Sequence, residues 1–225
     1  MNSLLLAQIT KSAYKALNFV YHTKQNIDLP EGWELENVFW GNDFDAMRPF
    51  GILVSQGDTA VFAFRGTETW SEWFEDAEIA LVPYPDSIGK VHCGFYRLFN
   101  SLVDKHQMPF TAVADGFKEV FYTGHSLGAA LATFGALKAN SARLVTFGSP
   151  KVGDKDFCNQ AYLTLGISLR YVSRFDPVPL LPLLSMSMTY DHFVNERTLQ
   201  DKQNSILSPA NNHFLDRYIQ LLESQ

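Results

Sequence analysis

The pattern of apolar and polar positions divides the chain into two differently organised parts. In the first part, apolar residues at helical spacing over about 3–27 predict a packing helix. Residues 33–40 and 50–55 are typical of short strands separated by a polar loop. Gln56-Gly57-Asp58 indicates a tight hairpin turn into a third strand at 59–64. We therefore expect antiparallel pairing at one end of a sheet.

The second part alternates between strand and helix patterns. A helical pattern at 95–106 leads to an apolar strand that begins near Val120, and an Ala-rich helix follows from Leu127. Further along, the pattern predicts a strand at 143–147, a helix at 154–164, a strand at 168–173 and a closing amphipathic helix at 211–222. This alternation predicts a parallel sheet with crossover helices, and thus an α/β fold.

Chain length and composition favour one packed domain. The 225 residues are 46% hydrophobic and 14% aromatic, which is enough to bury a sizeable core. Because no repeat, low-complexity tract or linker pattern interrupts the chain, we expect a single domain over 1–225.

Charge and cysteine usage exclude several classes of partner. The formal net charge of −6 argues against nucleic acid and against electrostatic recruitment to anionic lipid. Cys93 and Cys158 are too few for a disulfide framework and have no companions at metal-ligand spacing, so we expect two reduced thiols and no metal. No run is long enough to span a bilayer, and the opening lacks the pattern of a secretory signal. A cytoplasmic or non-classically exported protein is the expectation.

The sequence from Val120 to Ala130 carries the strongest chemical signal. Gly124, Ser126 and Gly128 form a Gly-x-Ser-x-Gly pattern between an apolar strand and an Ala-rich helix. In hydrolases this pattern is the nucleophile elbow, a sharp turn that exposes a serine hydroxyl at the end of a sheet. The start of the following helix would offer unpaired N–H groups to an oxyanion.

A nucleophilic serine needs a histidine base, and in this type of fold the base follows the serine in the chain. Only His192 and His213 satisfy that order. His213 is favoured because it lies at the start of the last helix, where a loop can deliver an imidazole to the end of the sheet. His192 stays open as an alternative. His125, adjacent to the serine, is expected to pack beside it.

The base in turn needs a carboxylate. Asp176 follows the strand at 168–173 and precedes Pro177, so it belongs to a loop at the carboxyl end of that strand, where sites in α/β sheets form. Asp154 also follows a strand, but a helix-capping role is the simpler explanation. Asp191 and Asp201 are weaker candidates.

Several sequence blocks together resemble the class 3, or fungal-type, lipase family. They occur in order from about Phe50 to the last helix and cover most of the chain: Phe64-Arg65-Gly66-Thr67, Val91-His92-Cys93-Gly94-Phe95, Gly124-His125-Ser126-Leu127-Gly128-Ala129-Ala130, Val145-Thr146-Phe147-Gly148-Ser149-Pro150-Lys151-Val152-Gly153, Asp176-Pro177-Val178-Pro179 and Asn212-His213. Tyr190-Asp191-His192-Phe193-Val194-Asn195-Glu196 resembles a non-catalytic block of that family, although Val194 replaces its glycine.

The resemblance implies an α/β-hydrolase fold with a mixed, mostly parallel sheet. It further implies a catalytic triad of Ser126, Asp176 and His213, without metal or organic cofactor. By the same similarity, Thr67 and the backbone N–H of Leu127 would form the oxyanion hole, where one well-placed donor typically lowers a barrier by roughly 3 kcal/mol.

Residues 68–82 combine an aromatic face with acidic residues, which predicts an amphipathic helix next to Thr67. In the resembling family this position holds a lid, and Trp70, Trp73 and Phe74 would form its apolar face. A fixed surface helix is the alternative. The acidic residues would repel anionic headgroups and tolerate neutral glycerides.

These patterns together predict a serine carboxyl-ester hydrolase, a lipase acting on acylglycerols at a lipid–water interface. Phospholipase A1 and a feruloyl or short-chain esterase are alternatives within the family. A catalytically silent lipid-binding relative is the alternative outside the enzyme class. Residues 178–188 offer an apolar wall for an acyl chain, or part of the buried core.

Overall fold

The structure is a computed structural model of the chain. It describes residues 1–16, 27–43, 46–67, 80–85, 88–111, 114–139, 143–182, 189–193, 195–201 and 208–225.

Seven of the described strands form a central sheet that mixes antiparallel and parallel pairing. In spatial order they are β1 (Glu34–Asp43), β2 (Ala46–Gln56), β3 (Thr59–Phe64), β6 (Glu119–His125), β7 (Arg143–Phe147), β8 (Ile167–Ser173) and β9 (Glu196–Leu199). β1, β2 and β3 pair antiparallel, and every later neighbour pairs parallel. The predicted mixed, mostly parallel α/β fold is confirmed. Two short strands, β4 (Leu81–Pro83) and β5 (Lys90–His92), pair separately.

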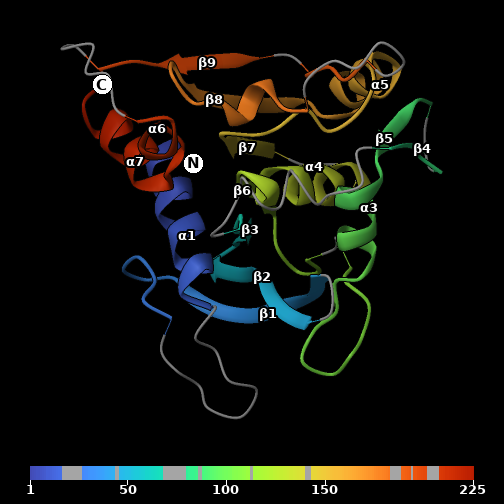
Figure 1. The fold of residues 1–225 in the computed structure, drawn as a ribbon. Coiled ribbons are helices and arrows are strands. Elements are labelled where there is room, and N and C mark those ends of the chain that lie inside the picture. Colours follow the sequence, from blue (N-terminus) through green and yellow to red (C-terminus); the bar gives the residue numbers. More distant parts are fainter. Residues whose placement is uncertain are drawn as a thin grey trace.

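Helices cover both faces of the sheet (Figure 1). One face carries α1 (Ser3–Lys15), α6 (Pro209–His213) and α7 (Leu215–Glu223). The other face carries α3 (Cys93–Asn100), α4 (Leu127–Ala139) and α5 (Lys155–Thr164). A short 3₁₀ turn, η2 (Val178–Leu180), follows β8.

Each face of the sheet has its own apolar core. On the α3–α5 side, Phe62 stacks on Tyr122 with ring centroids 4.8 Å apart, and Phe134 packs in the same cluster. On the α1–α7 side, the core includes Ile9 and Phe147. α4 belongs to the deepest layer, because all of its residues from Leu127 to Ala136 are buried. Its Ala and Gly side chains let it lie close to the sheet.

The strand predictions are confirmed in place and corrected in extent. The strand at 143–147 has the predicted bounds, and residues 57–58 form the predicted turn of a hairpin. The polar loop expected between residues 40 and 50 is wrong at both ends, since Gly41–Asp43 pair with Ala46–Arg48 as an extension of the β1–β2 ladder. Backbone pairing holds that extension, so it needs no apolar side chains. β9 was not predicted, because it is short and only Leu199 is buried.

Two predicted helices differ from the structure. α3 ends at Asn100, and Val103 then forms a bridge with Trp40 instead of continuing to His106. The closing helix breaks into α6 and α7 at Phe214, whose backbone is extended in ψ (φ −57°, ψ 139°). This break separates His213 from the packed helix that follows.

Candidate active site

Ser126 lies on a tight turn between β6 and α4, as the Gly-x-Ser-x-Gly pattern predicts. Its backbone has a positive φ of 56°, a conformation that costs a non-glycine residue about 1–3 kcal/mol. A Cβ on Gly124 would lie 2.1 Å from the carbonyl oxygen of Gly128, and a Cβ on Gly128 would lie 2.3 Å from that of Phe64. Strand and helix can therefore approach this closely only because both positions are glycine.

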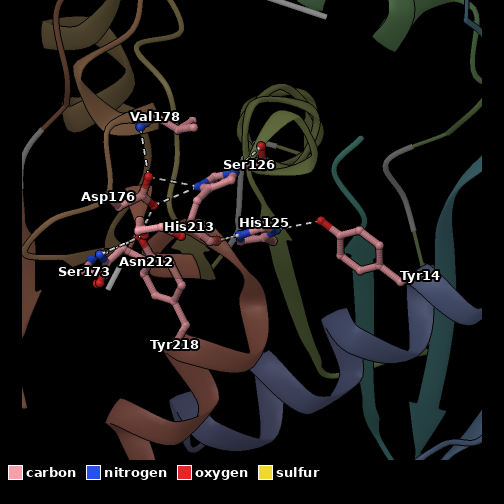
Figure 2. Close-up of polar contacts among 10 residues, drawn as sticks. Tyr14, His125, Ser126, Ser173, Asp176, Val178, Asn212, His213 and Tyr218 are labelled. Carbon is pink, nitrogen blue, oxygen red and sulfur yellow. Dashed lines mark hydrogen bonds and ion pairs between the residues drawn. The ribbon is translucent and has the colours of Figure 1, made fainter. Parts of the chain in front are cut away.

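The structure brings Ser126, His213 and Asp176 into one chain of hydrogen bonds (Figure 2). The Oγ atom of Ser126 lies 2.8 Å from Nε2 of His213. Nδ1 of His213 lies 2.8 Å from Oδ2 and 3.0 Å from Oδ1 of Asp176. All three residues are buried, with 1%, 2% and 5% of Ser126, His213 and Asp176 exposed. This geometry suits transfer of a proton from the serine hydroxyl to the imidazole.

The surroundings of Asp176 define where the protons lie. The carboxylate accepts bonds from the Val178 N–H (2.9 Å) and from the Tyr218 hydroxyl (2.6 Å). The Tyr218 oxygen in turn accepts the Ser173 N–H at 3.0 Å. Burial, together with the Asp176 carboxylate, raises the pKa of Tyr218 well above its usual value, so the hydroxyl stays a donor. With its carboxylate acting as an acceptor, Asp176 fixes the proton of His213 on Nδ1, so Nε2 is the nitrogen that accepts from Ser126.

Gly148, just past the end of β7, makes room for this arrangement. Its φ is +58°, and a Cβ there would lie 2.9 Å from Oδ2 of Asp176 and 3.2 Å from Cε1 of His213. Neither Gly148 nor Tyr218 was predicted from the sequence as part of the site. A glycine immediately after a predicted strand, and one hydroxyl on the apolar face of the last helix, are the signals that would have found them.

The alternative candidates lie elsewhere. Nε2 of His192 donates to the carbonyl oxygen of Pro179 at 2.6 Å, and burial lowers the pKa of His192 to about 4. Asp154 caps α5 by accepting the Phe157 N–H at 2.9 Å, as predicted. Asp201 forms an ion pair with Arg217 at 2.6 Å.

Asp191, the remaining carboxylate candidate, also has a local role. Its Oδ1 accepts the N–H of the next residue, His192, at 2.8 Å, and its own backbone N–H donates to Gly153. Neither bond involves Ser126, and Asp176 is the carboxylate that contacts His213.

Thr67 and Leu127 flank the serine. Leu127 opens α4, so its N–H is one of the first four that an α-helix leaves without an intrahelical acceptor. Gly66 approaches the elbow so closely that a Cβ there would lie 2.7 Å from Cβ of Ser126. The Oγ1 atom of Thr67 is buried and has no hydrogen-bond partner among the described residues. Such an unpaired buried hydroxyl is unusual in a folded protein and is suited to a ligand.

A pocket of about 290 Å³ opens beside these residues. Tyr14, Thr67, His213 and Phe214 line it, together with other residues of α1 and α7. The predicted lid residues Trp70, Trp73 and Phe74 lie outside the described residues, so the lid over 68–82 stays a prediction. Among the residues that the structure describes, no three His, Cys, Asp or Glu side chains are grouped as a metal site requires.

The prediction that His125 merely packs beside the serine is incomplete. The imidazole is buried, and both of its nitrogens form hydrogen bonds: Nδ1 lies 2.6 Å from the Tyr14 hydroxyl, and Nε2 lies 2.7 Å from the carbonyl oxygen of His213. Tyr14 lies on α1, within the predicted packing helix, for which the sequence indicated no role at the site.

The mixed sheet, the elbow and the bonded serine, histidine and aspartate are those of an α/β-hydrolase. The family model of lipase (class 3) matches residues 61–186, more than half of the 225-residue chain. The chain therefore belongs to the class 3 lipase family.

Curated relatives include both lipases and phospholipases. The chain is 34% identical to a lipase of Rhizomucor miehei, over 58% of this chain and 40% of the relative. It is 30% identical to the secreted mono- and diacylglycerol lipase A of Penicillium cyclopium, over 73% of this chain and 56% of the relative. It is 27% identical to phospholipase A1-II 3 of Oryza sativa subsp. japonica, over 92% of this chain and 61% of the relative. The chain thus spans about 40–60% of the length of these relatives.

Solved structures share the fold. One is a triacylglycerol lipase described as having a serine protease triad as its catalytic centre, with a TM-score of 0.71 and 25% identity over 89% of this chain and 80% of that chain. Another is an MDLA variant from Penicillium cyclopium, with a TM-score of 0.67 and 23% identity over 92% of this chain and 83% of that chain. Within the described part of this chain, no helix is both long and apolar enough to cross a membrane.

Proposed function

We propose that this protein is a serine carboxyl-ester hydrolase that acts on acylglycerols. The observation that carries the proposal is the continuous hydrogen-bonded series from Ser126 through His213 to Asp176, with the serine on a strained elbow. A serine and a histidine 87 residues apart are held at 2.8 Å inside a buried site. Membership of the class 3 lipase family supports the same activity.

In the proposed mechanism, Ser126 attacks the ester carbonyl while Nε2 of His213 accepts its proton. The resulting imidazolium is stabilised by Asp176, which keeps the ring in the orientation set by its Nδ1 proton. The alcohol then leaves with the proton from His213, and an acyl-serine remains. Water repeats the sequence with His213 again as base, releasing the fatty acid and restoring Ser126.

The negative charge of the tetrahedral intermediate requires donors on the other side of the serine. We assign this role to the Leu127 N–H and to Thr67, through its backbone N–H and its hydroxyl. Three observations support the assignment: the position of Leu127 at the start of α4, the close approach of Gly66 to Ser126, and the unpaired buried Oγ1 of Thr67. Donors that are already oriented stabilise a developing charge without reorganisation.

Neutral glycerides are the substrates that the chain favours. The pocket beside Thr67 and His213 has Phe214 and Leu215 in its wall, so it suits an apolar group. The acidic sequence of 68–78 disfavours anionic headgroups. A lipase and a mono- and diacylglycerol lipase are among the relatives of at least 30% identity.

Phospholipase A1 activity is the second candidate. One observation favours it: the rice phospholipase A1-II 3 aligns over 92% of this chain, a larger share than either fungal lipase reaches. A phospholipid and a triglyceride present the same ester to Ser126, so the difference lies in the headgroup that the site must accept.

The lid and the compartment both extend the proposal. Ser126 is only 1% exposed, so an ester reaches it only after covering atoms move, which supports an access step of the kind that a lid provides.

Because the Penicillium relative is named as secreted, the predicted cytoplasmic or non-classical location is to be tested by locating the intact chain in cells and medium of its natural source.

The test is hydrolysis of a neutral triglyceride series from dissolved short-chain to emulsified long-chain esters, with phosphatidylcholine vesicles in parallel. Ser126→Ala is the control for each substrate. Serine-dependent release that rises when the triglyceride forms an interface is expected. Release confined to phosphatidylcholine would replace the lipase by a phospholipase, release confined to dissolved esters would replace it by an esterase, and no release would leave a lipid-binding protein.

A further inference from the structure

A path of hydrogen bonds connects the loop of Thr67 to the turn of His213 on the side of the elbow away from Asp176. The Gly66 N–H donates to the Tyr14 hydroxyl oxygen at 2.9 Å. The same hydroxyl lies 2.6 Å from Nδ1 of His125, and Nε2 of His125 lies 2.7 Å from the carbonyl oxygen of His213. Figure 2 shows the part of the path from Tyr14 to His213. It crosses from α1 through the end of β6 to α6.

Hydrogen-bond chemistry sets the direction of every bond in this path. A carbonyl oxygen only accepts, so Nε2 of His125 carries a proton and donates to His213. The pKa of His125 lies well below its usual value, mainly because the ring is buried, so the imidazole is neutral and its Nδ1 is an acceptor. The Tyr14 hydroxyl therefore donates to Nδ1, and its oxygen accepts from the Gly66 N–H. Each of the three hydrogen bonds in the path thus has one donor hydrogen, from Gly66, Tyr14 and His125 in turn.

The backbone is shaped to meet this path at both ends. At one end, the helix breaks at Phe214, where the Arg217 N–H donates to Phe214 at 2.9 Å and the bonding of α7 begins, and the His213 carbonyl oxygen accepts from Nε2 of His125. At the other end, a Cβ on Gly66 would lie 2.8 Å from the Tyr14 hydroxyl oxygen, so only glycine allows this approach.

We propose that Tyr14 and His125 are positioning residues that hold the Gly66–Thr67 loop and the His213 turn at a fixed separation on the two sides of Ser126. This role rests on the proposed function of Ser126, His213 and Thr67. The transition state of ester cleavage needs the base and the oxyanion donors in place at the same time. A displacement of about 1 Å can reduce the rate about 100-fold. Tyr14 and His125 also line the pocket beside Thr67, so bound substrate would lie against the path.

The first test removes a single oxygen atom. Tyr14→Phe deletes the acceptor for Gly66 and the donor to His125 while the ring of Tyr14 stays in place. On a dissolved short-chain ester, kcat should fall on the order of 10- to 100-fold while KM changes less than about twofold, since ground-state binding is kept. The matched control is Tyr171→Phe, whose hydroxyl bonds to Ser3 Oγ at 2.9 Å, and which should keep the wild-type kcat. Equal kcat for wild type and Tyr14→Phe would overturn the proposal.

A double-mutant cycle separates positioning from unrelated local damage. His125→Phe breaks the same path at its next step. If the path acts as one unit, combining it with Tyr14→Phe should lower kcat little further than the worse single variant does. Independent effects that multiply would contradict a shared path. Thermal unfolding of each variant shows whether a loss of kcat merely follows a loss of folded protein.

The hydrogen bonds of this path can also be tested by NMR without a substrate. In protein labelled with ¹⁵N at histidine, the ring nitrogens of His125 should report the neutral tautomer with its proton on Nε2 between about pH 6 and 8, in keeping with the lowered pKa of His125. A proton on Nδ1 would overturn the path itself. If the wild type hydrolysed no ester, the proposed function and the positioning role would both fall, whereas activity unchanged in Tyr14→Phe would remove the positioning role alone.

Discussion

The two halves of the candidate site are held in place by different means. The elbow is local: Ser126 is presented by five consecutive residues, and two glycines allow β6 and α4 to touch backbone to backbone. The C-terminal half is assembled from residues that are far apart in the sequence. Tyr218, which holds Asp176, lies 42 residues from it, and His213 lies 87 residues from Ser126. The elbow thus belongs to the folded core, whereas the C-terminal half depends on individual side-chain bonds. Damage to the first should cost mainly stability, and damage to the second should lower the rate as well.

The largest effect on chemistry should come from the carboxylate. Asp176→Asn keeps the shape of the side chain but no longer favours the Nδ1 proton of His213, and the loss in kcat should be about 10⁴-fold. The fold should survive, as checked by circular dichroism. Asp154→Asn is the matched control, because asparagine caps a helix as well as aspartate does. A loss below tenfold in Asp176→Asn would show that Asp176 does not orient the base.

The elbow should respond in the opposite way. Gly124→Ala places a methyl group 2.1 Å from the Gly128 carbonyl oxygen, where only backbone movement can relieve the overlap. We expect a loss of more than about 3 kcal/mol in the free energy of unfolding, measured by urea titration. Gly166→Ala, which meets no atom within 4 Å, should be nearly neutral. A well-folded Gly124→Ala protein would contradict the account of the elbow.

A smaller effect should follow from loosening Asp176 instead of replacing it. Tyr218→Phe removes the donor to Oδ2 of Asp176 and leaves the buried Ser173 N–H without its acceptor. Stability should fall by about 1–3 kcal/mol and kcat by about tenfold. Unfolding curves and single-substrate kinetics measure the two losses, with Tyr171→Phe as reference. If kcat stayed at the wild-type level, the long-range half would be less dependent on Tyr218 than its contacts indicate.

The smallest effect on chemistry is expected from a titrating group outside both halves, which changes stability with pH. Burial lowers the pKa of His92 to about 4, against about 6.5 when unfolded, so the unfolded chain takes up the proton first as the pH falls. The contribution to stability is therefore complete above about pH 6.5 and is lost between there and pH 4. The slope from this group approaches about 1.4 kcal/mol per pH unit.

The His92→Asn variant isolates that contribution. Asparagine can still accept the Phe95 N–H that His92 accepts at the start of α3, but it does not titrate. As the pH falls from 6.5 to 4, the unfolding free energy of the variant should therefore decrease less steeply than that of the wild type. The difference in slope corresponds to the uptake of about one proton on unfolding. Identical slopes would show that His92 is not the group that titrates.

Much of the fold was predictable because it is encoded in local patterns. The strand at 143–147, the hairpin turn at Gly57 and the helix that follows Ser126 each rest on residues close in sequence. β9 was missed because a short, exposed edge strand has little apolar pattern. The break at Phe214 was missed because α6 and α7 together keep one amphipathic pattern, and only the tertiary contacts of His213 explain the interruption.

The site was predictable where chain order and residue chemistry limit the choice. The order of serine, acid and base, together with the resemblance to the lipase family, led to Asp176 and His213, and the structure places His213 against Ser126 and Asp176 against His213. Tyr14 and Tyr218 escaped prediction because each sits at a helical position that packing alone explains. Their hydroxyls matter only through partners that the fold brings near, such as His125, which is 111 residues from Tyr14.

The most direct test of the central claim is covalent labelling with a neutral alkyl p-nitrophenyl phosphonate. A serine activated by its base displaces p-nitrophenolate and keeps a tetrahedral phosphonyl group, which peptide mass spectrometry can locate. We predict one adduct per chain, on Ser126, formed at least 10³-fold more slowly in His213→Ala, because the loss of a triad member removes most of the activation. An adduct on any other residue, or an equal rate in His213→Ala, would show that Ser126 and His213 do not form one nucleophilic centre.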